Sequence, residues 1–143
     1  MPQRSSRAAR SGCPISIALE QLGDPWSLLI VRDLMFTGLS TFHAFLHAGE
    51  GIATNILSDR LDRLERTGLI TRRRDRADAR RFVYRLTAKG MGLAPVLVEI
   101  ILWSAKHGPT DAPPATVREM RRRRTRFLRR VRARWMHPGM RAA

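Results

Sequence analysis

The sequence predicts a mainly α-helical fold with one small β-hairpin, followed by a separate C-terminal helix. Several segments between residues 13 and 67 repeat apolar residues at three- and four-residue spacing, as helices with one buried face do. Two short segments, 69–74 and 81–86, carry β-branched or aromatic residues and flank a polar loop. Helices followed by an arginine-rich hairpin are the outline of a winged helix-turn-helix domain.

The first half of the chain marks its helix ends clearly. A helix is expected from Pro14 to Gly23, because proline at the first helical position sacrifices no hydrogen bond. The next helix is expected to start at residues 24–25, where aspartate precedes proline, and to end at residues 37–38. A short helix from about Thr41 should follow.

The helix expected over residues 54–67 has the most regular pattern. Leu57, Leu61 and Leu64 recur at the spacing of one helical face and should point into the core. Gly68 should end the helix and let the chain turn into the first strand of the hairpin.

Two further helices are expected after the hairpin. The first should run from about residue 87 to 106, with Pro95 interrupting and kinking it. A capping box, Thr116-x-x-Glu119, should open the second. The expected division is a flexible basic arm (1–12), a winged helix-turn-helix DNA-binding domain (13–107), a linker (108–115), a basic amphipathic dimerisation helix (116–136) and a tail (137–143).

Charge is the strongest feature of the composition. The 143 residues include 27 Lys and Arg against 12 Asp and Glu, which gives a net charge of +15. Arginine supplies 25 of the 27 cations, and residues 108–143 alone carry +9. Guanidinium groups pair with phosphate oxygens through two hydrogen bonds, so this bias favours a polyanionic partner such as double-stranded DNA.

Other classes of protein fit the sequence less well. A single cysteine, Cys13, permits no intramolecular disulfide and suits the reducing cytoplasm. No run of 18 apolar residues suggests a membrane span, so no membrane partner is expected. There is no glycine-rich phosphate loop, nucleophile elbow or acid–base pair, so we expect neither an enzyme nor a cofactor.

The helix at residues 54–67 should read DNA bases with the face opposite its leucines. Asparagine can pair with adenine, serine can donate or accept, and aspartate can accept from cytosine. The residues expected to touch DNA on this helix are Thr54, Asn55, Ser58, Asp59 and, at the edge of the face, Arg63.

The hairpin should supply most of the phosphate contacts. It carries six arginines within ten residues, opposed by only two aspartates. A basic loop of this kind can follow a minor groove or a phosphate ridge. The arginines expected to touch DNA are Arg73, Arg74, Arg76, Arg80 and Arg81.

An ordered set of short motifs links residues 13–107 to a known family. The motifs are Cys13-Pro14, Leu22-Gly23-Asp24-Pro25-Trp26, Arg32-Asp33-Leu34, Phe42, Gly51-Ile52, Leu57-Ser58-x-Arg60-Leu61-x-x-Leu64-Glu65, Gly68-Leu69-Ile70, Tyr84-x-Leu86-Thr87, Gly90 and Pro95-Val96-Leu97. Together they resemble the HxlR-type winged-helix transcriptional regulators, related to the MarR regulators. The resemblance implies a homodimeric bacterial DNA-binding regulator that answers a small molecule or an oxidative signal.

Three positions depart from that family pattern. Ala53 stands where the family usually has a serine before the recognition helix, and Asn55 stands where a basic residue is common. The hairpin has Ala79-Arg80-Arg81 where the family usually carries a proline, and its loop is closer to MarR wings. These differences bear on the operator sequence and on the wing contacts.

Two small sites have both a functional and an ordinary structural interpretation. Cys13 lies at a helix start, where the helix dipole favours the reactive thiolate, and the resemblance implies oxidant or electrophile sensing by a cysteine there. The alternative is a small residue in a dimer core. His43 and His47 have the i, i+4 spacing of a metal pair, but no third ligand accompanies them, so no metal is expected.

The combined prediction is a cytoplasmic, homodimeric, sequence-specific transcriptional regulator, more in keeping with a repressor, with a small-molecule or redox effector. The rival is a sequence-independent nucleic-acid-binding or architectural protein. The +9 C-terminal segment favours the rival, and the polar face of the helix at 54–67 favours the regulator.

Overall fold

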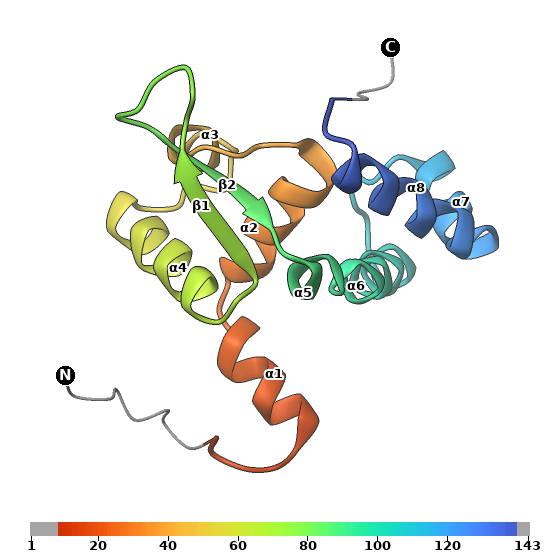
Figure 1. Cartoon of the computed structure of the whole chain (residues 1–143). Coiled ribbons are helices and arrows are strands. Elements are labelled where there is room, and N and C mark those ends of the chain that lie inside the picture. Colours follow the sequence, from red (N-terminus) through yellow and green to blue (C-terminus); the bar gives the residue numbers. More distant parts are fainter. Residues whose placement is uncertain (1–8, 140–143) are drawn as a thin grey trace.

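The computed structural model describes residues 9–139 as a helical domain with a two-stranded sheet and a C-terminal pair of helices. This confirms the predicted fold class (Figure 1). The elements in chain order are α1 (Pro14–Leu22), α2 (Ser27–Arg32), the π-helical segment η1 (Asp33–Thr37), α3 (Phe42–Leu46), α4 (Thr54–Arg66), β1 (Ile70–Arg74), β2 (Phe82–Leu86), α5 (Ala88–Met91), α6 (Ala94–His107), α7 (Pro114–Arg122) and α8 (Arg124–Met136).

The core forms where α2 and α4 meet the hairpin. Leu57, Leu61 and Leu64 are at most 2% exposed, as their spacing predicts. They share one cluster with Ile30 and Val31 of α2, and Val31 is fully buried although it lies outside the apolar stripe expected for this helix. Burying one leucine side chain contributes roughly 1.5–3 kcal/mol, so this stripe alone holds α4 firmly in place.

The hairpin is antiparallel and joins the rest of the domain at its base. β1 pairs with β2 from Ile70 opposite Leu86 to Arg74 opposite Phe82. The N–H of Tyr84 also donates to the carbonyl oxygen of Ser40, 2.8 Å away, which ties β2 to the segment before α3. The loop between the strands therefore extends from a fixed base.

The start of α2 differs from the expectation by two residues. Asp24 does cap the helix: its Oδ1 accepts from the N–H groups of Trp26 at 2.8 Å and Ser27 at 2.9 Å. Its Oδ2 accepts from the hydroxyl of Ser27 at 2.5 Å. Because these bonds close a turn over residues 24–26, regular helix begins only at Ser27.

The prediction of a single kinked helix over residues 87–106 is wrong. The chain forms two helices, α5 and α6, which are separated at Gly92 and Leu93. Pro95 lies in the first turn of α6, where a missing N–H removes no hydrogen bond, so it starts a helix rather than kinking one. The turn of α5 is close-packed: a Cβ on Gly90 would lie 2.2 Å from the carbonyl oxygen of Leu69.

The segment Ala88–His107 has the length and mean hydropathy, 1.4, of a membrane-spanning helix by composition alone. Core helices of soluble proteins share that composition. Here the segment is divided into two helices, and Leu97 and Val98 are buried in the domain core. Its inner face is therefore part of the core, whereas Val96, Ile100 and Trp103 are exposed.

The prediction of one continuous helix over residues 116–136 is also wrong. Helix α7 begins at Pro114, and the chain turns at Arg123, with φ −133° and ψ 45°, before α8. Thr116 consequently lies inside α7 and makes no capping box. Glu119 instead binds Arg130 of α8, so this carboxylate links two helices rather than capping one.

The apolar stripe of the C-terminal helices packs on the chain's own domain. Met120, Phe127 and Val131 are at most 4% exposed and belong to the domain core. At the end of α8, the indole N–H of Trp135 donates to the carbonyl oxygen of Leu86, 2.9 Å away. These three apolar residues are thus buried within one chain.

Candidate nucleic-acid interface

Helix α4 presents its polar face to solvent. Because the three leucines point inward, the opposite side exposes Asn55, Ser58 and Asp59, as the sequence predicted. Thr54 is the first residue of the helix and is also exposed. Ala53 occupies the N-cap position without a side-chain hydrogen bond, so the first turn leaves backbone N–H groups available to an anion.

One residue of this helix, missed at the sequence level, organises the neighbouring charges. Arg60 donates to Oδ2 of Asp59 at 2.5 Å, and its Nε lies 3.1 Å from Oδ1 of Asp24. Burial alone would raise the pKa of Asp24, but hydrogen bonds from Ser27 and Trp26 and the charge of Arg60 hold it below its usual range. Because Arg60 also pairs with Asp59, the negative charge of Asp59 on the exposed face is partly offset.

The hairpin of β1 and β2 with its loop, which we call the wing, is held against α4 by an arginine of β1. Nε of Arg72 lies 3.1 Å from Oε2 of Glu65, in the last turn of the helix. The guanidinium of Arg72 also covers the ring of Phe82, 4.6 Å from its centroid. Arg63, expected at the edge of the reading face, is half-buried. Helix and hairpin are thus positioned together.

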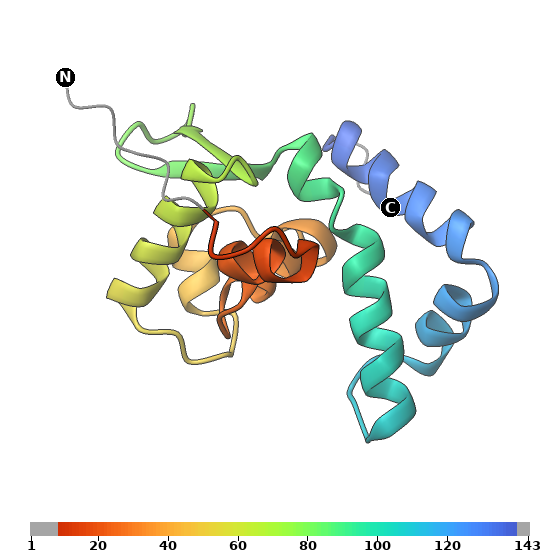
Figure 2. The ribbon, with the colours of Figure 1, turned by 90° about the horizontal axis from the view of Figure 1, so that it is seen from below.

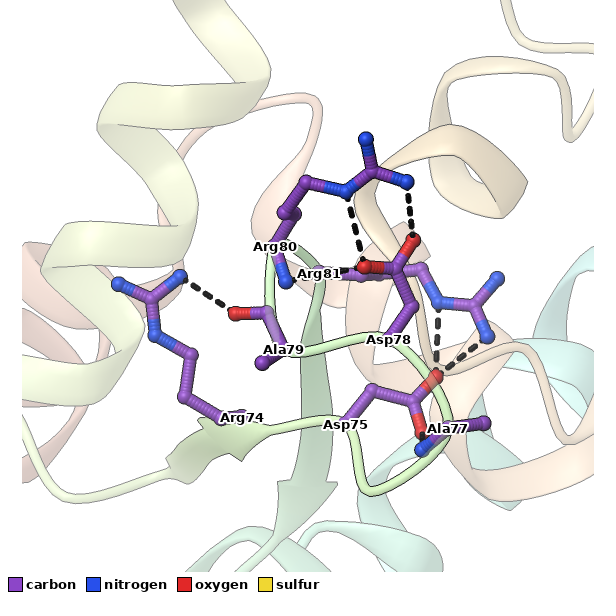
Figure 3. Close-up of polar contacts among 7 residues, drawn as sticks. All are labelled: Arg74, Asp75, Ala77, Asp78, Ala79, Arg80 and Arg81. Carbon is purple, nitrogen blue, oxygen red and sulfur yellow. Dashed lines mark hydrogen bonds and ion pairs between the residues drawn. The ribbon is translucent and has the colours of Figure 1, made fainter.

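Two aspartates shape the wing loop (Figure 3). Oδ1 of Asp75 accepts from the N–H of Ala77 at 3.0 Å, and Oδ2 accepts from Nε of Arg81 at 2.8 Å. These two donors hold the pKa of Asp75 below its usual range. Asp78 accepts from both the side chain and the backbone of Arg80, which lowers its pKa in the same way.

The wing arginines consequently differ in their availability. Figure 3 shows Arg81 held by Asp75 and Arg74 donating to the carbonyl oxygen of Ala79, 3.0 Å away. The guanidinium of Arg74 also lies over the ring of Phe82. The side chain of Arg80 is 92% exposed despite its aspartate partner. Arg73 and Arg76 are exposed and have no side-chain partner among residues 9–139. Sequence counting alone cannot make this distinction.

The remaining candidates lie elsewhere. Cys13 is exposed at the N-cap of α1, and Figure 1 shows α1 on the opposite side of the domain from the loop between β1 and β2. The rings of His43 and His47 are 4.2 Å apart, but Nδ1 of His47 is 2.8 Å from the carbonyl oxygen of His43. Within the described part of the chain, no group of three or more metal-ligating side chains occurs.

A family comparison identifies this arrangement of helices and wing. The model of the HxlR-like helix-turn-helix family matches residues 21–112, which include α2 to α6. The chain belongs to the HxlR-like helix-turn-helix family. It is therefore a helix-turn-helix transcriptional regulator, and its relatives are regulators rather than enzymes. Helices α7 and α8 lie beyond the matched residues.

Named relatives support the assignment. The chain is 35% identical over 108 residues to the uncharacterized HTH-type transcriptional regulator Rv3095 of Mycobacterium tuberculosis, covering 75% of this chain and 67% of the relative. It is 35% identical over 95 residues to the uncharacterized HTH-type transcriptional regulator YvaP of Bacillus subtilis, covering 66% and 87%.

Solved structures share the fold. PA1607, a candidate transcription factor, superposes with a TM-score of 0.65 at 36% identity, covering 73% of this chain and 71% of that one. The reduced transcriptional regulator YodB of B. subtilis superposes with a TM-score of 0.56 at 26% identity, covering 68% and 95%. YodB has also been solved with a bound quinone.

Proposed function

We propose that the protein is a cytoplasmic, sequence-specific DNA-binding repressor that acts as a homodimer. The recognition helix α4 of each chain enters a major groove, and the two grooves lie about 34 Å apart on an inverted-repeat operator. Asn55 and Ser58 read base edges, while Arg73, Arg76 and Arg80 hold phosphates.

One observation carries this proposal: an exposed polar helix face lies beside a wing with unpaired arginines. Base readout needs short polar side chains that can reach into a groove, and Asn55 and Ser58 meet that need. Affinity needs cations free to replace counterions on phosphates, and Arg73 and Arg76 are free in this sense among the described residues. Arg81 supports the loop through Asp75 instead.

Exposed apolar side chains support the homodimer. Helix α1 buries none of its residues, and Ile15 is 71% exposed. On α6, Trp103 is 67% exposed, and Val96 and Ile100 are exposed beside it. Clusters of water-exposed apolar side chains mark interaction surfaces, and a second copy of the chain offers the same two faces.

A salt-controlled mobility-shift titration tests the proposal. The protein is titrated against the intergenic DNA upstream of its own gene, with scrambled DNA as competitor. A discrete complex that survives excess scrambled competitor supports a sequence-specific regulator. Equal binding to both DNAs, lost together as salt rises, would instead support the sequence-independent alternative.

Asn55→Ala separates base readout from phosphate contact. Loss of one good base contact should reduce discrimination between operator and scrambled DNA by about 1–3 kcal/mol and leave non-specific affinity unchanged. Equal loss on both DNAs would remove Asn55 from the reading face.

Cys13 is proposed as the sensor of an oxidative signal. It is exposed at the start of α1, on the same helix as the apolar face assigned to the dimer. Hydrogen peroxide would oxidise one Cys13 thiolate to a sulfenic acid, which condenses with the second Cys13 of the dimer and releases water. Treated wild-type protein should then run as a disulfide-linked dimer and lose operator affinity, whereas Cys13→Ser should do neither.

A further inference from the structure

The bend between α7 and α8 creates a shallow cleft of about 460 Å³. One carboxylate and five guanidinium groups line it, which leaves a net charge of +4. The lining side chains are those of Arg118, Glu119, Arg122, Arg123, Arg126 and Arg130. We call this site the arginine cleft.

Only one of the five cations is neutralised. Both oxygens of Glu119 accept from Arg130, at 2.5 and 2.8 Å. This pairing, together with the charges of Arg126 and Arg123, holds the pKa of Glu119 below its usual range, so the carboxylate is ionised near neutral pH. Within residues 9–139, no carboxylate pairs with Arg118, Arg122, Arg123 or Arg126.

The walls of the arginine cleft are held by the domain. Phe127 and Val131 of α8 are buried, and Arg124 pairs with Glu99 of α6. Trp135 fixes the far end of α8 to β2 through its hydrogen bond to Leu86. Because the helices are packed in place, the backbone positions that carry these arginines are fixed before any ligand arrives, which lowers the entropic cost of binding.

The cleft is separate from the proposed DNA interface. Figures 1 and 2 both show α7 and α8 on the opposite side of the molecule from α4. A duplex held by α4 and the wing of one chain therefore leaves the cleft of that chain open. The cleft also lies outside residues 21–112, the part that matches the family.

Four unpaired guanidinium groups around a recess suit a ligand with several anionic groups close together. Guanidinium binds phosphate oxygens in pairs, and such charge-assisted bonds are about twice as strong as neutral ones. A duplex would favour cations spread along an outer surface rather than gathered in a hollow. We propose that the arginine cleft binds a compact oligophosphate, with Arg118, Arg122 and Arg126 contacting its oxygens.

Calorimetric titration of the full chain with sodium tripolyphosphate, at constant ionic strength, tests this site without any DNA. We expect one tripolyphosphate per chain. The variant Arg122→Ser with Arg126→Ser should bind about a hundredfold more weakly or worse, since each lost charged hydrogen bond costs about tenfold or more in affinity.

A matched variant, Arg129→Ser with Arg132→Ser, removes the same charge from exposed positions on α8 that do not line the cleft. It should bind tripolyphosphate within about twofold of the wild type, because neither side chain lines the cleft and salt screens exposed charges. Both variants alter exposed side chains without ion pairs, so their thermal unfolding should match the wild type.

Three outcomes would overturn the proposal. Wild-type protein that fails to bind tripolyphosphate, or that binds many per chain, would show no defined site. Equal weakening in the two variants would mean diffuse attraction. A third titration uses a short DNA duplex: if loss of Arg122 and Arg126 weakens binding of the duplex but not of tripolyphosphate, the cleft is a nucleic-acid contact instead.

Discussion

Replacing Arg73 and Arg76 by serine removes the two wing cations that have no partner among the described residues. Their loss should leave the wing loop intact, because other residues hold it. Asp75 accepts from the N–H of Ala77 and from Arg81, and Asp78 accepts from Arg80. The variant therefore tests phosphate contact without disturbing the fold.

The magnitude follows from counterion release. Each phosphate contact contributes about 0.9 to the slope of log affinity against log salt concentration on duplex DNA. Two arginines per chain make four contacts in the proposed dimer, so the slope should fall by about 3.6. Affinity should fall by a similar factor on operator and scrambled DNA, since phosphates carry no sequence information.

The assay is a mobility-shift titration at several salt concentrations, with Arg129→Ser and Arg132→Ser as the charge-matched control. The control changes net charge equally but lies on α8, away from the wing. If both variants lower the slope equally, attraction depends on total charge and the wing has no special role. An unchanged slope in the wing variant would remove Arg73 and Arg76 from the interface.

Three further predictions concern the fold and the loop. Leu61→Ala, at a site 2% exposed, should lower the free energy of urea unfolding by about 2–5 kcal/mol, whereas the exposed Ser58→Ala should change it by less than about 0.5; equal effects would contradict the burial of the leucine stripe. Gly90→Ala places a Cβ 2.2 Å from the carbonyl oxygen of Leu69 and should cost at least about 1–3 kcal/mol in the same assay, so an unchanged stability would refute the close packing of α5 on Leu69 and on Leu86 of β2. The N–H of Ala77 and a guanidinium lower the folded pKa of Asp75, so the loop contacts are present above the ordinary aspartate value of about 3.9 and are lost as pH falls through the lower folded value. The amide resonance of Ala77 should follow that transition, and a midpoint at or above the ordinary value would contradict the hydrogen bonds.

Local patterns in the sequence predict the elements that carry their own signals. Leu57, Leu61 and Leu64 follow the helical period, and burial on one face is the physical cause of that period. The two strands of the hairpin lie within a residue of their expected bounds, since a polar loop separates two β-forming runs. These signals depend on neighbours in sequence, so they survive without knowledge of the tertiary structure.

The availability of each wing arginine depends on pairing, which the sequence does not encode locally. Arg73 and Arg81 are equivalent in a count of charges. The structure binds Arg81 to Asp75 and leaves Arg73 exposed, because the loop turns through the hydrogen bonds of its aspartates. The base of the wing is similar: Arg72 meets Glu65 only when β1 lies against α4.

The C-terminal helices depend most strongly on tertiary contacts, because their sequence favours a single straight helix. No glycine or proline stands at the bend, and eleven residues of straight helix would separate Glu119 from Arg130 by about 16 Å along the axis. In the folded chain the bend at Arg123 brings these side chains to 2.5 Å, and Met120 and Phe127 both reach the core. Burial of the apolar residues thus offsets the lost helical hydrogen bonds. The same bend gathers Arg118, Arg122 and Arg126 around one hollow, so a charge that composition attributes to a diffuse basic tail becomes a defined site.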